Sequence, residues 1–224
     1  MLIVFDLDDT LIDSWNTSIP IKLKIALQEM IKAGLKVENE ETAFQRLLKL
    51  NDSTDNGKMA LQTFLQELNI NNEKILEIGH HAYYGGPVVE IVRPPLPGAL
   101  EVLQQLHQHH TLSLVTHGEP ATQNDKIKRA HIDASLFKKI IITPHYDKLN
   151  SYKKILQELN FKPENSVVIG DKYKTDLLPA KALGMKTVHM KWGKGKILVP
   201  KEGEVDYIIS DLMEFPKIVE ELSK

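Results

Sequence analysis

The chain has 224 residues, a length that suggests one to two domains at roughly 100–200 residues each. Hydrophobic residues make up 42% of the chain and charged residues 26%, a balance typical of folded globular proteins that excludes a disordered chain. The 28 basic and 30 acidic residues leave a net charge of −2, so no overall positive field favours nucleic acid or an anionic membrane. With no cysteine, disulfides, thiolate metal sites and a cysteine nucleophile are excluded.

The N-terminal segment shows no export or membrane signal. Met1 leads directly into a short apolar run and then Asp6, with neither the basic region nor the apolar length of a signal peptide. No run approaches the ~18 apolar residues that cross a bilayer. We therefore expect a cytoplasmic protein with a small-molecule partner.

A first strand over 2–7 is followed by a long block without strands. Helical periodicity predicts helices over 17–33, with Pro20 in the opening turn and Gly34 as a stop, and then over 40–50, 57–68 and 72–83. Gly85-Gly86-Pro87 ends the block, and Pro94, Pro95 and Pro97 mark the return to mixed structure. We expect residues 15–88 to form a helical cap inserted into a core domain of residues 1–14 and 89–224.

The rest of the chain alternates strands with helices. Short β-branched runs predict strands over 112–116, 139–143, 166–170, 186–191 and 206–210. Between them we expect helices over 98–109, 121–131, 149–159 and 175–183, the last closed by Gly184. This repeating βαβ pattern predicts an α/β fold with a Rossmann-like, doubly wound parallel sheet.

Two acidic groups follow predicted strands. Asp6 and Asp8 end the first strand, and residues two apart in an extended segment project to the same side. Gly170-Asp171 ends another strand, with Asp176 at the start of the next helix. Ligands of such sheets bind at the carboxyl ends of the strands. Neighbouring carboxylates repel one another unless a cation is present, and Mg²⁺ prefers oxygen ligands.

A third strand ends in Thr116-His117-Gly118. A hydroxyl followed by a run of backbone N–H groups is suited to hold phosphate oxygens. The sequence therefore predicts a phosphate site beside the acidic groups.

These motifs resemble the haloacid dehalogenase superfamily, and within it the phosphatases with a C1 cap, of the phosphoglycolate phosphatase type. The family motif DxDxT reads Asp6-Leu7-Asp8-Asp9-Thr10 here, the strand ending in Thr or Ser matches Thr116, and GDxxxxD matches Gly170-Asp171 through Asp176. We assign the motif lysine, which precedes a helix, to Lys148; Lys138, Lys139, Lys153 and Lys154 lie near it.

The resemblance implies a role for each residue. Asp6 would attack phosphorus to form an aspartyl-phosphate, and Asp8 would act as general acid and then general base. Thr116 and the N–H groups of His117 and Gly118 would bind the phosphoryl oxygens, with Lys148 offsetting their charge. The ligands of Mg²⁺ would be Asp6, the carbonyl of Asp8, Asp171 and Asp176, although Asp176 could instead support the other ligands or stabilise the first turn of its helix.

The implied function is Mg²⁺-dependent hydrolysis of a small phosphomonoester metabolite. Asp8 argues against carbon–halogen cleavage, since the family's dehalogenases generally lack an acid at this position. A phosphomutase on the same scaffold and a noncatalytic phosphate-binding or interaction module stay open as alternatives. The cap would select the substrate, but its sequence contains no motif that identifies which one.

Overall fold

The computed structural model describes residues 1–85, 91–144 and 148–224. The chain divides into two compact units. Met1–Ser14 and Arg93–Lys224 form the first, which we call the sheet unit, and Trp15–Val92 form the second, the helical unit. The predicted boundary between residues 88 and 89 lies outside the described residues.

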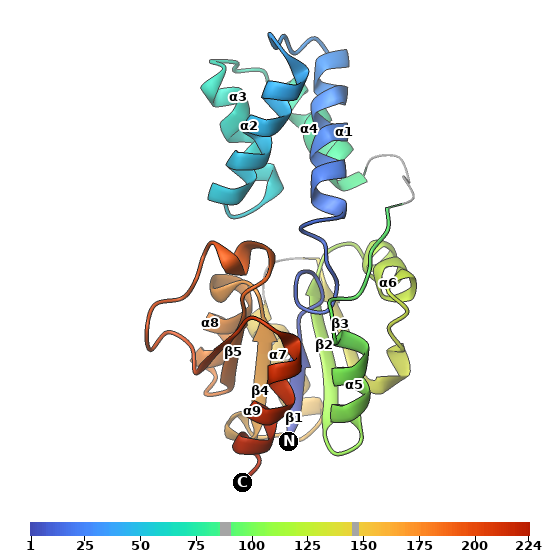
Figure 1. Ribbon diagram of the computed structural model, residues 1–224, viewed down its shortest axis with the longest axis vertical. Helices are drawn as coiled ribbons and strands as arrows, with labels where there is room; N and C mark the ends of the chain where they lie inside the picture. Colours follow the sequence, from blue (N-terminus) through green and yellow to red (C-terminus); the bar gives the residue numbers. More distant parts are fainter. Residues whose placement is uncertain (86–90, 145–147) are drawn as a thin grey trace. The chain divides into compact units, whose positions relative to one another are not determined.

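The sheet unit is built on six parallel strands in the order β3-β2-β1-β4-β5-β6 (Figure 1). The central strand β1 pairs with both β2 and β4, so that Phe5 lies beside Leu114 and Ile169. This sheet confirms the predicted α/β fold. The strands are β1 (Leu2–Phe5), β2 (Thr111–His117), β3 (Phe137–Thr143), β4 (Ser166–Gly170), β5 (Lys186–Met190) and β6 (Tyr207–Ile209).

Helices cover both faces of this sheet. Since alternate strand residues point to opposite faces, β1 packs against both layers of helices. Ile3 and Phe5 pack with α5 (Ala99–His107), α6 (Pro120–Arg129) and α9 (Phe215–Leu222). Leu2 and Val4 pack on the other face with α7 (Lys148–Glu158) and α8 (Leu178–Ala182). The strands are therefore buried on both sides, which explains why their sequences are continuously apolar.

The helical unit consists of α1 (Ser18–Lys32), α2 (Glu40–Ser53), α3 (Gly57–Glu67) and α4 (Glu73–Gly85). Asn39 and Asn56 cap the second and third helices, each accepting a hydrogen bond from a backbone N–H of the first turn. Gly34 ends the first helix with a φ of 105°, a conformation that favours glycine. The unit has a core of its own, which includes Leu23, Leu27, Met30, Leu47, Leu61 and Phe64.

Two elements differ from the sequence-based prediction. The predicted helix 175–183 is instead a π-helical turn, η3 (Tyr173–Leu177), followed by the short α8. Pro179 lies in the first turn of α8, and because proline lacks the N–H that would continue the preceding turn, a new helix begins there. The helix α9 was not predicted at all.

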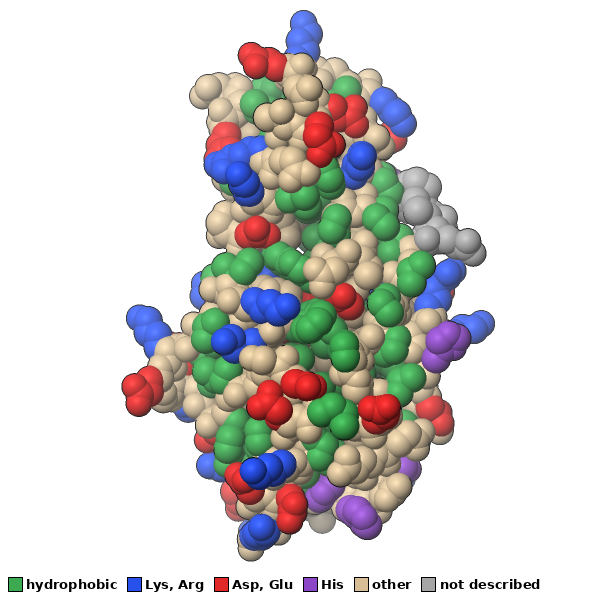
Figure 2. Space-filling model, viewed as in Figure 1, with side chains coloured by type: hydrophobic (Ala, Val, Ile, Leu, Met, Phe, Trp, Pro, Cys, Tyr) green, Lys and Arg blue, Asp and Glu red, His purple; other side chains and the backbone are tan. Residues whose placement is uncertain are grey.

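None of the helices in the described part of the chain is long and apolar enough to cross a membrane. On the face drawn in Figure 2, basic and acidic side chains are interspersed over the surface. This face therefore shows no extended surface of one sign of charge.

Candidate active site

The order of the strands brings the predicted site residues to one edge of the sheet. Since β1 lies between β2 and β4, the residues that follow these three strands meet at their carboxyl ends. Asp6 follows β1, Thr116 is the last residue but one of β2, and Asp171 follows β4. Lys148, the first residue of α7, comes from the connection after β3.

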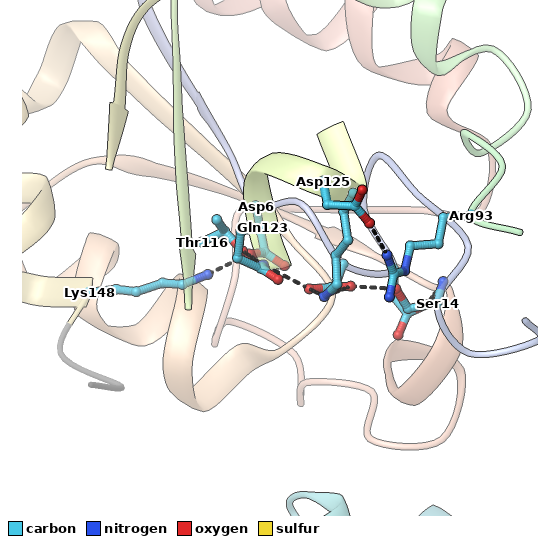
Figure 3. Close-up of polar contacts among 10 residues, drawn as sticks. Asp6, Ser14, Arg93, Thr116, Gln123, Asp125 and Lys148 are labelled. Carbon is cyan, nitrogen blue, oxygen red and sulfur yellow. Dashed lines mark hydrogen bonds and ion pairs between the residues drawn. The ribbon is translucent and has the colours of Figure 1, made fainter. Parts of the chain in front are cut away.

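Three buried carboxylates lie together at this edge. Asp6, Asp171 and Asp176 each offer an oxygen, and these oxygens lie within 4.8 Å of one another. The Lys148 ammonium bridges two of them: it lies 2.7 Å from Oδ1 of Asp6 (Figure 3) and 2.7 Å from Oδ1 of Asp176. Lys148 is thus the lysine that the fold brings to the acidic cluster. Lys139 pairs with Glu158 instead, and Lys138 and Lys153 are exposed.

The two lysines near the cluster, Lys148 and Lys172, do not fully balance its three buried carboxylates. The pKa of Asp6 is raised to about 6: burial is the largest cause and Asp176 adds to it, while Lys148 opposes both. Burial raises the pKa of Asp171 well above its ordinary value; the nearby charge of Lys172 opposes this shift, and neighbouring carboxylates add to it. Asp176 is the exception: burial would raise its pKa, but Lys148 and Lys172 outweigh burial and lower it.

Asp171 lies in an environment that calls for a cation. Both of its carboxylate oxygens are buried, and neither has a hydrogen-bond partner among the described residues. An unpaired buried carboxylate is costly, yet the backbone holds this one beside two others. Three clustered carboxylate oxygens suit a hard divalent cation, so the residues present fit a metal ion.

The backbone around Gly170 determines how closely Asp176 approaches. A Cβ atom added at Gly170 would lie 2.7 Å from Cβ of Asp176, a separation that only glycine permits. Asp176 belongs to the π-helical turn, and its Oδ2 accepts a hydrogen bond from the Lys172 amide at 2.9 Å. The missing side chain of Gly170 therefore lets the turn pack against the end of β4.

The Asp8 carboxylate is not part of this cluster. Lys126 of α6 donates to both of its oxygens, at 2.8 and 2.6 Å, and Gln123 donates to Oδ2 at 3.1 Å. The Ser14 hydroxyl also donates to it. Burial would raise the pKa of Asp8, but the charge of Lys126 and the hydrogen bonds from Lys126, Ser14 and Gln123 together outweigh burial and lower it. Asp6 and Asp8, which the sequence suggested would share one cation, thus each contact a lysine of their own.

The predicted phosphate-binding groups differ in whether their donor protons already make hydrogen bonds within the protein. The Thr116 hydroxyl oxygen accepts a hydrogen bond from Gln123 at 2.5 Å (Figure 3), which leaves its own proton to be donated. The Gly118 amide already donates to the carbonyl of Thr143 at 3.0 Å. It could bind a phosphoryl oxygen only by giving up that bond. Burial lowers the pKa of the His117 ring.

Sequence reasoning missed Gln123 and Lys126. Both lie on α6, three residues apart and therefore on one face. The sequence signal that could have indicated them is the lack of apolar residues in this helix, in which Ile127 is the sole large apolar side chain. A helix that packs on a sheet with so little apolar surface must bury polar groups instead.

The fold and the site together define an α/β protein with a cluster of buried carboxylates at the carboxyl edge of a parallel sheet. Residues 3–190 match the family model of haloacid dehalogenase-like hydrolases. The match spans most of the chain. The protein belongs to the haloacid dehalogenase-like hydrolase family.

Individual relatives agree with this assignment. A glyceraldehyde 3-phosphate phosphatase of Pyrococcus furiosus is 31% identical over 230 aligned residues, covering 98% of this chain and 92% of the relative. One of Methanocaldococcus jannaschii is also 31% identical, with 99% and 98% covered. A structure described as a predicted phosphoglycolate phosphatase from Haemophilus somnus superposes with a TM-score of 0.71 at 19% identity, over 97% of this chain and 96% of that one. At this identity the structural likeness concerns the fold.

Proposed function

We propose that this enzyme is a Mg²⁺-dependent phosphatase that hydrolyses a small phosphomonoester through an aspartyl-phosphate on Asp6. The observation that carries the proposal is the cluster of Asp6, Asp171 and Asp176 with Lys148 bridging two of its members. The relatives named as phosphatases support the reaction class.

The metal ion would be held by Asp6, Asp171 and Asp176, together with the main-chain carbonyl of Asp8. The orphaned Asp171 carboxylate supports this assignment, since a cation would supply the partner it lacks. When bound, Mg²⁺ would neutralise the clustered carboxylates and stabilise charge on the phosphoryl group. It would also favour the ionised form of Asp6, which burial otherwise disfavours.

The side chains of the enzyme supply the remaining chemistry. In the first step an Asp6 oxygen bonds to phosphorus while the bond from phosphorus to the alcohol oxygen breaks. Because Lys126 keeps Asp8 ionised, the proton that Asp8 passes to the alcohol oxygen is one it takes from the substrate, which enters as the phosphate monoanion. In the second step Asp8 removes a proton from water, which attacks phosphorus and releases Asp6 and inorganic phosphate. Lys148 and the Thr116 hydroxyl would hold the phosphoryl oxygens through both steps.

We propose glyceraldehyde 3-phosphate as the first substrate to test, because it is the one in the names of the two curated relatives. The helical unit would act as the cap that selects the substrate. Its insertion directly after the residues that follow β1 supports this role.

The test measures phosphate release from glyceraldehyde 3-phosphate and from p-nitrophenyl phosphate, with Mg²⁺ and with excess EDTA. We expect activity that requires the metal and falls by at least ~10³-fold in Asp6→Asn, which loses the nucleophile. Asp133→Asn removes an exposed aspartate outside the site and should keep full activity. Full activity in EDTA or in Asp6→Asn would refute the proposal.

A further inference from the structure

The buried face of α6 is unusual in its chemistry. Its buried residues are Gln123, Lys126 and Ile127, so two of the three are polar. Burying an ammonium group costs free energy unless a partner compensates it, and Lys126 is only 8% exposed. Its partner is Asp8.

The contacts to Asp8 fix the carboxylate from several directions. Lys126 spans both oxygens, Gln123 donates to Oδ2, and Ser14 donates to Oδ1. The Asp8 side chain nevertheless stays 21% exposed. One side of a tightly held carboxylate is therefore open to a ligand.

Gln123 extends this arrangement to a second site residue. Its side-chain Nε2 donates to Oδ2 of Asp8 at 3.1 Å and to Oγ1 of Thr116 at 2.5 Å. Figure 3 shows its amide directed at Thr116. One amide group thus sets the position of Asp8 relative to Thr116.

Other contacts also attach α6 to the sheet unit. Ile127 packs in the core of that unit, and Asp125 of the same helix pairs with Arg93 at 2.8 Å. Because neither contact involves Lys126, we expect a Lys126 variant to retain them, which allows its role to be tested apart from folding.

We propose that Lys126 and Gln123 are positioning residues that hold the Asp8 carboxylate facing the oxygen of the leaving alcohol. The inference rests on the proposed function, in which Asp8 donates a proton as the phosphorus–oxygen bond to the alcohol breaks. A carboxylate free to rotate would spend less time aligned with that oxygen, and such losses of alignment can cost ~10²-fold in rate. Neither residue bonds to the reacting atoms in this scheme.

The experiment compares substrates whose leaving groups differ in how much they need a proton from Asp8. An alkyl phosphate such as glycerol phosphate releases a strongly basic alkoxide, whereas p-nitrophenyl phosphate releases a stable anion that leaves unprotonated. The value of kcat/KM reports the steps through release of the alcohol. It would be measured for a series of phosphomonoesters graded between these two, with wild type, Lys126→Met and Gln123→Leu.

We expect Lys126→Met to lower kcat/KM by ~10²-fold on the alkyl phosphates and by no more than a few fold on p-nitrophenyl phosphate. Gln123→Leu should show the same dependence on the leaving group with a smaller loss. Lys126→Arg, which keeps a cation able to bond both oxygens, should recover part of the loss. Lys128→Met removes an exposed lysine from the same helix and should match wild type.

The outcomes separate this inference from the proposed function. Wild type that hydrolyses no phosphomonoester overturns both. Wild type that is active and depends on Asp6, with a Lys126→Met loss that is equal across the series or absent, overturns the positioning role alone. If Lys126→Met does not fold, the same leaving-group comparison in Gln123→Leu decides the question.

Discussion

Two aspartates separated by a single leucine, Asp6 and Asp8, have pKa values shifted in opposite directions. The Asp6 carboxylate lies among other buried carboxylates, which together with burial raise its pKa to about 6 in spite of Lys148. The Asp8 carboxylate has Lys126 to itself, which lowers its pKa despite burial. The environment rather than the residue type therefore separates the two. The separation means that Asp6, unlike Asp8, is still partly protonated near pH 6 when no cation is bound.

Substitution of Asp171 tests how much the carboxylate cluster of Asp6, Asp171 and Asp176 lowers the free energy of unfolding when no metal ion is bound. Because its carboxylate is buried without a hydrogen-bond partner, Asp171→Asn should stabilise the EDTA-treated protein by about 1–3 kcal/mol in urea unfolding. Added Mg²⁺ should stabilise wild type by ~2–3 kcal/mol near 100 times Kd, and the variant by much less.

Asp206 serves as the matched control for that substitution. Its Oδ2 accepts hydrogen bonds from the amide and the hydroxyl of Thr187, so Asp206→Asn should destabilise the protein and leave the Mg²⁺ response intact. If Asp171→Asn also destabilises the EDTA-treated protein, the carboxylate cluster is not strained.

The raised pKa of Asp6 predicts a pH dependence with a definite sign. The folded protein keeps the Asp6 proton up to a pH of about 6, whereas an unfolded aspartate loses it near 3.8. Between these values the folded state binds more protons, so the Asp6 contribution to stability is lost as the pH rises. In EDTA, Asp6→Asn should equal wild type below pH ~4 and exceed it by on the order of 2–3 kcal/mol above pH ~6.

Urea unfolding of the two proteins from pH 4 to 8 checks this. Histidines with lowered pKa values, such as His117 and His189, titrate alike in both proteins and cancel in the difference. A stability difference that is constant with pH, or that grows toward acid, would contradict the prediction.

At the residue scale, the sequence located the groups carried by strand ends. Asp6, Thr116 and Asp171 each directly follow or end an apolar run, and parallel strands bring their carboxyl ends to one edge. Lys126 and Gln123 escaped prediction because their positions depend on which face of α6 meets the sheet. Their side chains also resemble those of any solvated helix.

At the scale of elements, the turn between β4 and α8 determines the geometry of the acidic cluster. π-Helical turns are rare and occur frequently at functional sites. Here the turn η3 places Asp176 where Lys148 and the Lys172 amide both contact it. Sequence periodicity does not distinguish such a turn from the first turn of an α-helix, so the sequence predicted the residue but not its backbone.

Gly170→Ala tests the close approach of this turn. The added methyl group would overlap Asp176 and displace the turn, so we expect at least a ~10-fold loss of Mg²⁺ affinity in titrations followed by thermal unfolding.

The control is Gly203→Ala, where nothing lies within 4 Å of the new methyl group but φ is 81°. It should cost ~1 kcal/mol of stability from backbone strain without changing Mg²⁺ affinity. Unchanged affinity in Gly170→Ala would show that the turn accommodates a side chain.

At the scale of the whole molecule, the chain has two hydrophobic cores that respond separately to mutation. Phe64 is 2% exposed in the core of the helical unit, so Phe64→Ala should destabilise that unit by ~3–5 kcal/mol. Hydrogen exchange should accelerate in α1 to α4 and stay unchanged in β1 and β4. Equal acceleration in both units would mean that they unfold as one.

Most of the architecture was predictable because the physical signals are strong. The strands are continuously apolar since both faces are covered, and the long stretch without strands predicted a helical block. The missed helix α9 covers eight residues at the end of the chain, where no further strand follows to complete a βαβ unit. The split of 175–183 depended on a single proline.

The position of β1 also has a consequence for synthesis of the chain. Both of its neighbours come much later, at Thr111–His117 and Ser166–Gly170. The helical unit, by contrast, has all of its core residues within Trp15–Val92. Since chains leave the ribosome from the N-terminus and domains fold as units, the inserted segment is the first part able to fold. The strand that precedes Asp6 stays an unpaired apolar segment until β2 has been made, about half way along the chain.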